Sequence, residues 1–483
     1  MSERESMPCD VVIIGGGPAG LAAAIRLKQV NAELEVVVLE KGSEIGAHIL
    51  SGAVVDPRAL DELLPEWRDQ GCPMAETPVT ENHHWVLSES GKSDLPEMLL
   101  PPFMSNHGNY TGSLGNMCRW LAEQAEALGV MVFPGFPAAE VIYGDDGSVA
   151  GVITQDMGIA ADGSQKPDFQ PGMEIHAKYT LFAEGARGSL TKQLKAKFDL
   201  EKDCQPQTYG LGIKELWEID PKKHVPGRVI HTQGWPLDND SWGGGFLYHI
   251  GDNQVALGFV TALDYANPYL SPYHEFQRWK HHPDILDIIE GGKRVAYGAR
   301  VINEGGWQSV PQLAFPGGAL IGCSAGFVNV PRIKGSHTAM KSGMLAAESV
   351  ASAIAAGKEH TQLDDYEENL RESWIATELK KVKNAQPAIA KLGGDFGTVL
   401  AGIDMWMRTL KIGLPFTLKH TPDYTHTKRA DLFDPIIYPK PDGVISFDRL
   451  TNVSFSFTNL TRGTVTVVYH RQLSASPLRI ICS

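Results

Sequence analysis

Residues 10–20 have the sequence DVVIIGGGPAG, in which an apolar run leads directly into a glycine-rich turn. The run at 11–14 is typical of a buried parallel strand, and Gly15, Gly17 and Gly20 occupy the three glycine positions of a G-x-G-x-x-G motif. In this motif the glycines give a tight turn, let the backbone approach a pyrophosphate, and let the following helix pack closely on the strand.

A second apolar run at 36–39 ends at Glu40, twenty residues beyond the last glycine of the motif. An acid at this position can accept hydrogen bonds from the ribose hydroxyls of an adenine dinucleotide. The glycine motif alone is weak evidence, but the strand, the helix, the second strand and the acid are all in register. We therefore predict that the chain begins with a dinucleotide-binding α/β domain.

The bulk composition limits the classes of protein that fit. With 483 residues the chain exceeds the usual size of one hydrophobic core, so two or three domains are expected. The net charge of −14 argues against a nucleic-acid partner, which needs basic patches. The six cysteines contain no C-x-x-C pair, so their spacing predicts no metal site and indicates a reducing compartment.

The chain offers no long apolar run. No stretch of eighteen uncharged apolar residues occurs, so we expect no transmembrane helix, and we also expect no targeting peptide before the first strand. From these features alone, a cytoplasmic chain is the default expectation.

Glycine-bearing strand ends recur three times, at 15–20, 184–189 and 317–326. Between the second and the third, residues 206–310 carry the short alternating runs of a mostly antiparallel sheet. This order is typical of FAD oxidoreductases of the glutathione-reductase and aromatic-hydroxylase type. These enzymes have a second sequence motif that contacts the cofactor, and Glu184 and Gly185 would belong to it here. The predicted fold is an α/β, glutathione-reductase-like FAD-binding domain with an inserted, mostly antiparallel sheet and a helical C-terminal part.

The third glycine-bearing segment leads into a helix predicted at 335–356. A helix N-terminus there would stabilise negative charge on the pyrimidine edge of a reduced flavin, which makes Gly322 and Gly335 candidate cofactor contacts. Lys334 and His337 would either add charge to this site or cap a surface loop. Cys323 is interpreted as a small buried hydrophobe rather than a redox thiol.

Several longer segments resemble the electron-transfer flavoprotein:ubiquinone oxidoreductase family of bacterial type. The resemblance runs from about residue 9 to 459, and the segments that carry it best are 46–53, 106–110, 183–185, 206–210, 276–283, 291–294, 315–343 and 438–443. It implies an enzyme that accepts electrons from reduced electron transfer flavoprotein and passes them through FAD to ubiquinone. It also implies attachment to one face of a membrane, in a bacterium the cytoplasmic face of the inner membrane.

The resemblance assigns further residues. Gly243 and Gly244 fall on the family's quinone-contacting glycines, where bare backbone lets a flat ring approach; the alternative is a β-turn between two strands. Two segments are candidate membrane contacts: residues 57–67, with Leu63 and Trp67, and an amphipathic helix in 399–418 that carries basic residues. In the second segment we expect the membrane contacts to be Trp406 and Phe416.

The expected parts of the chain follow from these assignments. They are an FAD-binding domain formed by 1–80, 111–205 and 311–360, a quinone-side irregular segment at 81–110, a ubiquinone-binding sheet domain at 206–310, a helical membrane-associated part at 361–459, and a divergent tail at 460–483.

The tail departs from the family pattern. Relatives continue into a ferredoxin-like region whose four cysteines hold a [4Fe-4S] cluster, whereas residues 460–483 contain one cysteine, Cys482, and no Asp or Glu. We expect a frameshifted or truncated iron–sulfur region whose cysteine ligands are absent, and we assign no catalytic residue and no metal ligand.

Other functions share these fingerprints. The first alternative is an FAD-dependent monooxygenase or a polyprenyl (geranylgeranyl) reductase. The second is a truncated FAD-binding product without electron-transfer activity.

Overall fold

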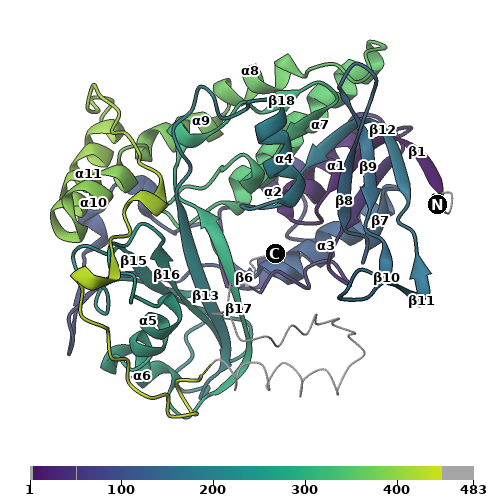
Figure 1. Cartoon of the computed structure of the whole chain (residues 1–483). Coiled ribbons are helices and arrows are strands. Elements are labelled where there is room, and N and C mark those ends of the chain that lie inside the picture. The colour runs from purple at the N-terminus through teal and green to yellow at the C-terminus, as the bar shows by residue number, and fades with distance from the viewer. Residues whose placement is uncertain (1–3, 51, 449–483) are drawn as a thin grey trace.

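The structure is a computed structural model that describes residues 4–50 and 52–448. The predictions for the tail at 460–483, Cys482 included, therefore concern residues outside the described ranges. Two large sheets dominate the described part of the chain, with the first β–α–β unit on one side and a separate helical group on the other (Figure 1).

The first large sheet contains the predicted nucleotide-binding strands. Its central order is β18-β19-β12-β1-β2-β7, with the hairpin β8–β9 joined to β12, and β1 pairs in parallel with both β2 and β12. Its strands are β1 (Ser6–Ile14), β2 (Val36–Glu40), β7 (Met131–Pro134), β8 (Ala138–Tyr143), β9 (Val149–Thr154), β12 (Glu174–Phe182), β18 (Ala314–Phe315) and β19 (Gly318–Leu320).

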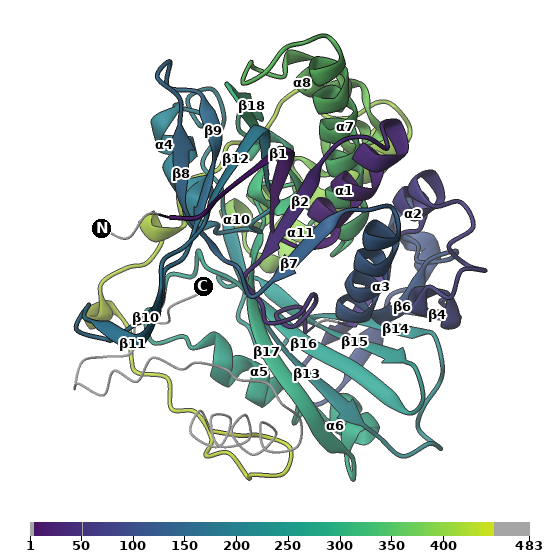
Figure 2. The same cartoon turned by 90° about the vertical axis from the view of Figure 1, so that its right-hand side faces the viewer.

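Both predicted central strands are buried along their apolar runs. Residues 11–14 of β1 and 36–39 of β2 are all buried, as expected where helices cover a parallel sheet. The helices α1 (Pro18–Val30) and α7 (Ser336–Ala355) pack against each other beside this sheet (Figure 2). The predicted α/β fold, its inserted sheet and its helical C-terminal part are confirmed.

The second sheet has seven strands among the described residues, in the order β17-β13-β16-β15-β14-β4-β5. It is antiparallel except where β4 lies parallel to β14. Its strands are β4 (Glu81–Leu87), β5 (Lys92–Asp94), β13 (Tyr209–Glu218), β14 (Arg228–Gly234), β15 (Gly243–Ile250), β16 (Gln254–Ala262) and β17 (Lys293–Asn303). Part of the segment predicted as irregular thus forms an edge of this sheet.

Two small sheets and the remaining helices complete the described fold. β3 (Gly52–Val55) pairs with β6 (Tyr110–Ser113), and β10 (Met157–Ile159) pairs with β11 (Gln165–Gln170). The helices are α2 (Arg58–Leu63), α3 (Leu114–Ala127), α4 (Ser189–Lys197), α5 (Pro272–Trp279), α6 (Pro283–Ile289), α8 (Asp364–Glu372), α9 (Trp374–Val382), α10 (Ala385–Leu392) and α11 (Gly394–Thr409).

Candidate functional site

The glycine turn between β1 and α1 has the geometry that the motif predicts. A Cβ on Gly20 would lie 2.1 Å from the carbonyl oxygen of Gly15, so helix α1 can approach the strand this closely only with glycine there. Gly17 is the N-cap residue of α1, has no side-chain cap, and borders open space. The first N–H groups of a helix lack partners within the helix, so this end can receive an anion.

Glu40 ends β2 beside this turn. Its Oε2 accepts a hydrogen bond from the backbone N–H of Gly16 at 2.9 Å, and its Oε1 accepts one from the N–H of Gly42 at 2.7 Å. A carboxylate can accept about four hydrogen bonds. Glu40 therefore has acceptor capacity for hydroxyl groups at the position where the sequence predicts a ribose.

The three glycine-bearing strand ends meet in space. A Cβ on Gly15 would lie 2.4 Å from the carbonyl oxygen of Ala183, next to the second segment. A Cβ on Gly322 would lie 2.8 Å from the Cβ of Ala19 in α1. The hydroxyl of Ser324 donates to the carbonyl oxygen of Gly185 at 3.4 Å. Segments far apart in sequence thus form one site at the carboxyl ends of parallel strands, where α/β folds bind ligands.

Glu184 uses its side chain within the fold. The carboxylate accepts hydrogen bonds from the N–H groups of Leu190 and Thr191, at 3.2 and 2.6 Å, and from the Thr191 hydroxyl at 2.7 Å. It therefore caps the first turn of α4. The neighbouring Gly185 has φ of 79° and borders open space, so this segment offers its backbone to the site.

The third segment begins α7 with Gly335 as its N-cap residue and without a side-chain cap. Helices α1 and α7 thus both start at glycines beside the same site. Burial raises the pKa of the Cys323 thiol to about 11, so the thiol stays protonated at neutral pH. The raised pKa agrees with the interpretation that Cys323 is not a redox thiol, although the residue is partly exposed rather than fully buried.

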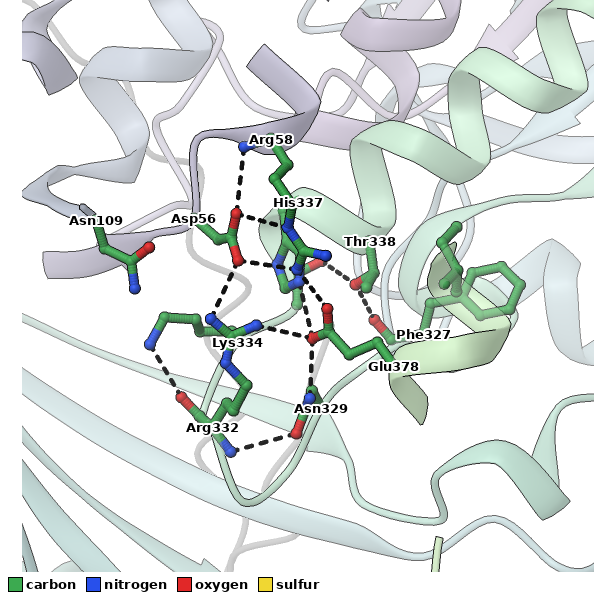
Figure 3. Close-up of polar contacts among 12 residues, drawn as sticks. Asp56, Arg58, Asn109, Phe327, Asn329, Arg332, Lys334, His337, Thr338 and Glu378 are labelled. Carbon is green, nitrogen blue, oxygen red and sulfur yellow. Dashed lines mark hydrogen bonds and ion pairs between the residues drawn. The ribbon is translucent and has the colours of Figure 1, made fainter. Parts of the chain in front are cut away.

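A buried ionic cluster lies beside the start of α7 (Figure 3). Arg332 donates to Oδ2 of Asp56 and to Oε1 of Glu378, each at 3.1 Å, and Arg58 pairs with both carboxylates. His337 contacts the same Oε1 of Glu378 at 3.0 Å through Nε2.

The charges in this cluster control the pKa values of its acids. Burial alone would raise the pKa of Asp56, but the hydrogen bond from Arg58 and the charges of His337, Arg58 and Arg332 lower it to about 2. Burial likewise opposes ionisation of Glu378, and His337 with the two guanidinium groups holds its pKa well below the usual range.

Lys334 and His337 are buried, with exposed fractions of 4% and 1%. The interpretation that they cap a surface loop is therefore wrong. Asp56, Arg58 and Glu378 were not predicted as site residues, because no local pattern shows that charges separated by about 320 residues will meet.

Gly243 and Gly244 open strand β15 and pair with Thr261 and Val260 of β16. They thus lie within the strand, and the alternative of a β-turn at these residues does not hold. A Cβ on Gly244 would lie 2.2 Å from the carbonyl oxygen of Thr232, so close contact between strands also requires glycine there.

The prediction that Leu63 and Trp67 contact a membrane is wrong. Their exposed fractions are 1% and 0%, and both belong to the core around the first sheet. The Trp67 indole donates to Oδ1 of Asp61 at 2.9 Å and packs edge-on against Tyr110. The apolar face of residues 57–67 is an ordinary core face, which produces the same sequence pattern as an interfacial helix.

A second apolar surface is exposed on and after α11, which we call the α11 surface. Phe416 is 49% exposed, whereas Trp406 is partly buried and its indole donates to the carbonyl oxygen of Leu99 at 2.8 Å. This bond brings a second exposed segment, Met98 and Leu99, to the helix. The other exposed apolar residues of the surface are Phe396, Val399, Ile403, Leu410 and Ile412.

The basic residues near this surface do not all face solvent. Arg408 is bound to Asp404 at 2.8 Å, while Lys411 and Lys419 are exposed. In the described ranges, no helix combines the length and apolarity needed to cross a membrane. The same ranges hold no cluster of three His, Cys, Asp or Glu side chains arranged for a metal ion.

Two family descriptions match parts of the chain. "ETF-QO, ubiquinone-binding" matches residues 209–302, which form most of the second sheet, and "NAD(P)-binding Rossmann-like domain" matches residues 13–64. Electron transfer flavoprotein-ubiquinone oxidoreductase of Pseudomonas aeruginosa is 52% identical over 465 residues, which cover 95% of this chain and 84% of the relative. The mitochondrial protein of that name from Sus scrofa is 53% identical over 472 residues, which cover 95% of this chain and 76% of the relative.

The chain belongs to the electron transfer flavoprotein-ubiquinone oxidoreductase family.

Solved structures with less similar sequences share the fold of this family member. A geranylgeranyl bacteriochlorophyll reductase-like protein from Thermoplasma acidophilum is 16% identical with a TM-score of 0.58, and the match covers 87% of this chain and 90% of that one. A flavin-dependent brominase, also 16% identical, gives a TM-score of 0.53 over 85% of this chain and 91% of the other. At this identity the likeness concerns the fold alone, which is that of FAD-dependent oxidoreductases.

Proposed function

We propose that this chain accepts electrons from reduced electron transfer flavoprotein and passes them through FAD to ubiquinone. The observation that carries the proposal is the 52–53% identity to two oxidoreductases of that name over 95% of the chain. The geometry of the glycine turns and of the second sheet agrees with it. The relatives' names do not favour a monooxygenase or a polyprenyl reductase.

The residues present fit FAD. The N-terminus of α1 at Gly17 offers N–H groups and open space to a pyrophosphate, and Glu40 has acceptor capacity for ribose hydroxyls. The backbone at Gly185 and Gly322 borders the same site, and the N-terminus of α7 at Gly335 would stabilise negative charge. When bound, FAD supplies the redox chemistry by taking up and giving out electrons.

We propose Gly243 and Gly244 as quinone contacts within the second sheet. Support comes from their position in the segment 209–302 that matches the ubiquinone-binding description. Both residues are partly exposed and carry no side chain that would keep a flat ring from the backbone. The fold needs glycine at these positions for strand contact as well, so the two roles are compatible.

We also propose that the α11 surface contacts a membrane, in a bacterium the cytoplasmic face of the inner membrane. Exposed apolar patches of this kind mark interaction surfaces, and an amphipathic helix with aromatic and basic residues is typical of attachment to one face of a bilayer. Lys411 and Lys419 would meet anionic headgroups.

The test of the proposed function is direct. The purified chain is loaded with FAD, mixed with reduced electron transfer flavoprotein and a short-chain ubiquinone, and quinone reduction is followed by absorbance. We expect electron transfer that depends on both partners. Bound FAD without transfer would identify an inactive FAD-binding product, and rapid oxidation of NAD(P)H would favour a monooxygenase or reductase.

A further inference from the structure

The amino group of Lys334 lies in an unusual environment. The side chain is 4% exposed, and Nζ donates to the side-chain oxygen of Asn106 and, at 3.3 Å, to the carbonyl oxygen of Arg332. Both acceptors are neutral oxygens rather than carboxylates. Buried lysines usually pair with an acid, because removing a charge from water is costly.

The neighbouring ionic cluster is balanced without Lys334. Asp56 and Glu378 contribute two negative charges, and Arg58 and Arg332, which contact both acids, contribute two positive charges. A proton on Lys334 therefore adds one positive charge that this cluster does not neutralise. Burial, reinforced by the charge of Arg332, lowers the pKa of Lys334 to about 7.

A chain of hydrogen bonds leads from Lys334 to the surface. Nδ2 of Asn106 donates to Oδ1 of Asn82 at 2.7 Å, and Nδ2 of Asn82 donates to Oε1 of Glu97 at 3.2 Å. Oε2 of Glu97 lies 3.2 Å from Nε2 of His107, whose side chain is 64% exposed.

The donor and acceptor order in this series of hydrogen bonds is fixed by the groups at its two ends. An ammonium group can only donate, and a carboxylate can only accept, so each amide between Lys334 and Glu97 must turn its oxygen toward the lysine. The aligned amide dipoles favour the protonated form of Lys334 and couple it to the charge of Glu97 at the surface.

Lys334 links the two parts of the fold that carry the predicted sites. It directly precedes Gly335, the N-cap of α7, while Asn82 and Asn106 belong to the segment that adds β4 to the second sheet. The titratable and charged groups around Lys334 are Arg332 on the same loop, Asp56 after β3, His84 on β4, His231 on β14, His337 on α7 and Glu378 on α9.

Most of these neighbours keep one charge state near neutral pH. Burial and the charge of Lys334 lower the pKa of His84 to about 4, and burial lowers the pKa of His231 well below its usual value. Burial outweighs the nearby acids and lowers the pKa of His337, while the hydrogen bonds and positive charges around Asp56 and Glu378 keep both acids ionised. In this group Lys334 is the side chain whose pKa is brought to about 7, by burial and by the charge of Arg332.

We propose that the amino group of Lys334 takes up a proton when electrons reach the flavin. The positive charge on Nζ then balances the negative charge that appears on the flavin. The inference rests on the proposed function. The proton comes from solvent and stays on Nζ, so no covalent bond to the cofactor or the quinone is formed. In a buried site an uncompensated charge is costly, so proton uptake makes electron arrival more favourable.

The test measures the midpoint potential of the bound flavin against pH in the holoprotein. We expect a change of slope near pH 7 in the wild-type protein. Lys334→Met should lose this change of slope and lower the potential below pH 7, whereas Lys334→Arg should lose the change of slope but keep a high potential. Lys341 is a lysine of α7, and it pairs with Glu62. The variant Lys341→Met is therefore the matched control and should give the wild-type curve.

Two milder variants keep the test decisive if Lys334→Met does not fold. Asn106→Leu removes an acceptor of the ammonium group, and Glu97→Gln removes the charge at the surface end, so both should move the change of slope to lower pH. The proposal is overturned if the folded Lys334→Met protein gives the wild-type curve, or if neither milder variant moves it. These measurements need neither electron transfer flavoprotein nor quinone, so they succeed or fail independently of the proposed function.

Discussion

Nε2 of His337 in α7 lies 3.0 Å from Oε1 of Glu378 in α9, and this contact joins the helix that borders the cofactor site to the C-terminal helices (Figure 3). The same carboxylate also pairs with Arg58 and Arg332. Glu378 is thus the acid on which two segments distant in sequence converge, one with Arg58 and one with Arg332 and His337. Its removal would leave the buried guanidinium group of Arg332 and the partly exposed one of Arg58 without one of their two acids.

Glu378→Gln should therefore destabilise the fold strongly. Breaking a buried ion pair by removing one partner costs about 3–5 kcal/mol. Glu348→Gln is the matched control, because Glu348 pairs with Arg26 at the surface and such pairs contribute about 0–1 kcal/mol. Urea unfolding of both variants measures the difference. Equal and small losses would show that the cluster contributes little to stability.

Acid should destabilise the fold through the same cluster. The pKa of Asp56 is lowered from 3.8 to about 2, so this carboxyl stabilises the folded chain above pH 3.8 and loses that contribution as the pH falls toward 2. The lowered pKa of Glu378 acts in the same direction, and the lowered pKa of His337 starts the loss below 6.5. We expect the free energy of unfolding to fall from pH 6 downward.

Asp56→Asn should flatten the lower part of this pH profile while reducing stability at pH 7. Urea unfolding at a series of pH values provides the measurement. A variant curve parallel to the wild-type curve between pH 4 and pH 2 would contradict the assignment to Asp56.

Two glycines of the turn after β1 allow packing and cofactor binding to be tested separately. Gly20→Ala places a Cβ 2.1 Å from a backbone oxygen and should destabilise the fold by about 1–3 kcal/mol or more. Gly17→Ala meets no atom within 4 Å, so the fold should lose at most about 1 kcal/mol, the cost of a poorer helix cap. Its methyl group would nevertheless enter the predicted pyrophosphate site.

We expect Gly17→Ala to weaken FAD binding roughly tenfold, equivalent to about 1.4 kcal/mol. Titration of the apoprotein with FAD, followed by flavin fluorescence, measures the dissociation constant, and urea unfolding measures the fold. An unchanged dissociation constant would remove Gly17 from the site.

The α11 surface gives a prediction for vesicle binding. Replacing Phe396, Val399 and Ile403 together by Ser should abolish sedimentation with anionic liposomes and leave the unfolding free energy nearly unchanged, because all three side chains are more than half exposed. Val30→Ser, on α1 and 47% exposed, is the control and should bind as wild type does. Undiminished sedimentation of the triple variant would rule out this surface.

Leu63→Ser should have the opposite effect. Because Leu63 is 1% exposed, the substitution should cost about 2–5 kcal/mol of stability and leave liposome binding of the folded fraction intact. Selective loss of liposome binding, without loss of stability, would restore the membrane role that the structure contradicts.

The sequence predicts best where the signal is local. The strand-turn-helix at 10–20, the acid at Glu40 and the small-residue helix of α7 each follow from neighbouring residues, and the structure has all three. The pattern at 57–67 is local too, yet it cannot tell a core face from a membrane face. Burial of Trp67 depends on what packs against it.

Features that depend on distant partners were missed. Segment 81–110 looks irregular because its strand β4 joins the second sheet through parallel pairing with β14, about 147 residues later. The ionic cluster is similar, since Asp56, Arg332 and Glu378 each look like ordinary charged surface residues until the fold brings them together.

The place of β4 has a consequence for dissecting the molecule. β4 alone covers the outer side of β14, because β14 otherwise pairs only with β15 among the described strands. A fragment cut to residues 209–302 would therefore expose the backbone of Arg228–Gly234 as a bare strand edge, which recruits other chains and aggregates. A fragment that is meant to keep this edge covered therefore has to include Glu81–Leu87, so the cut that the sequence match suggests is not a natural boundary of the folded molecule.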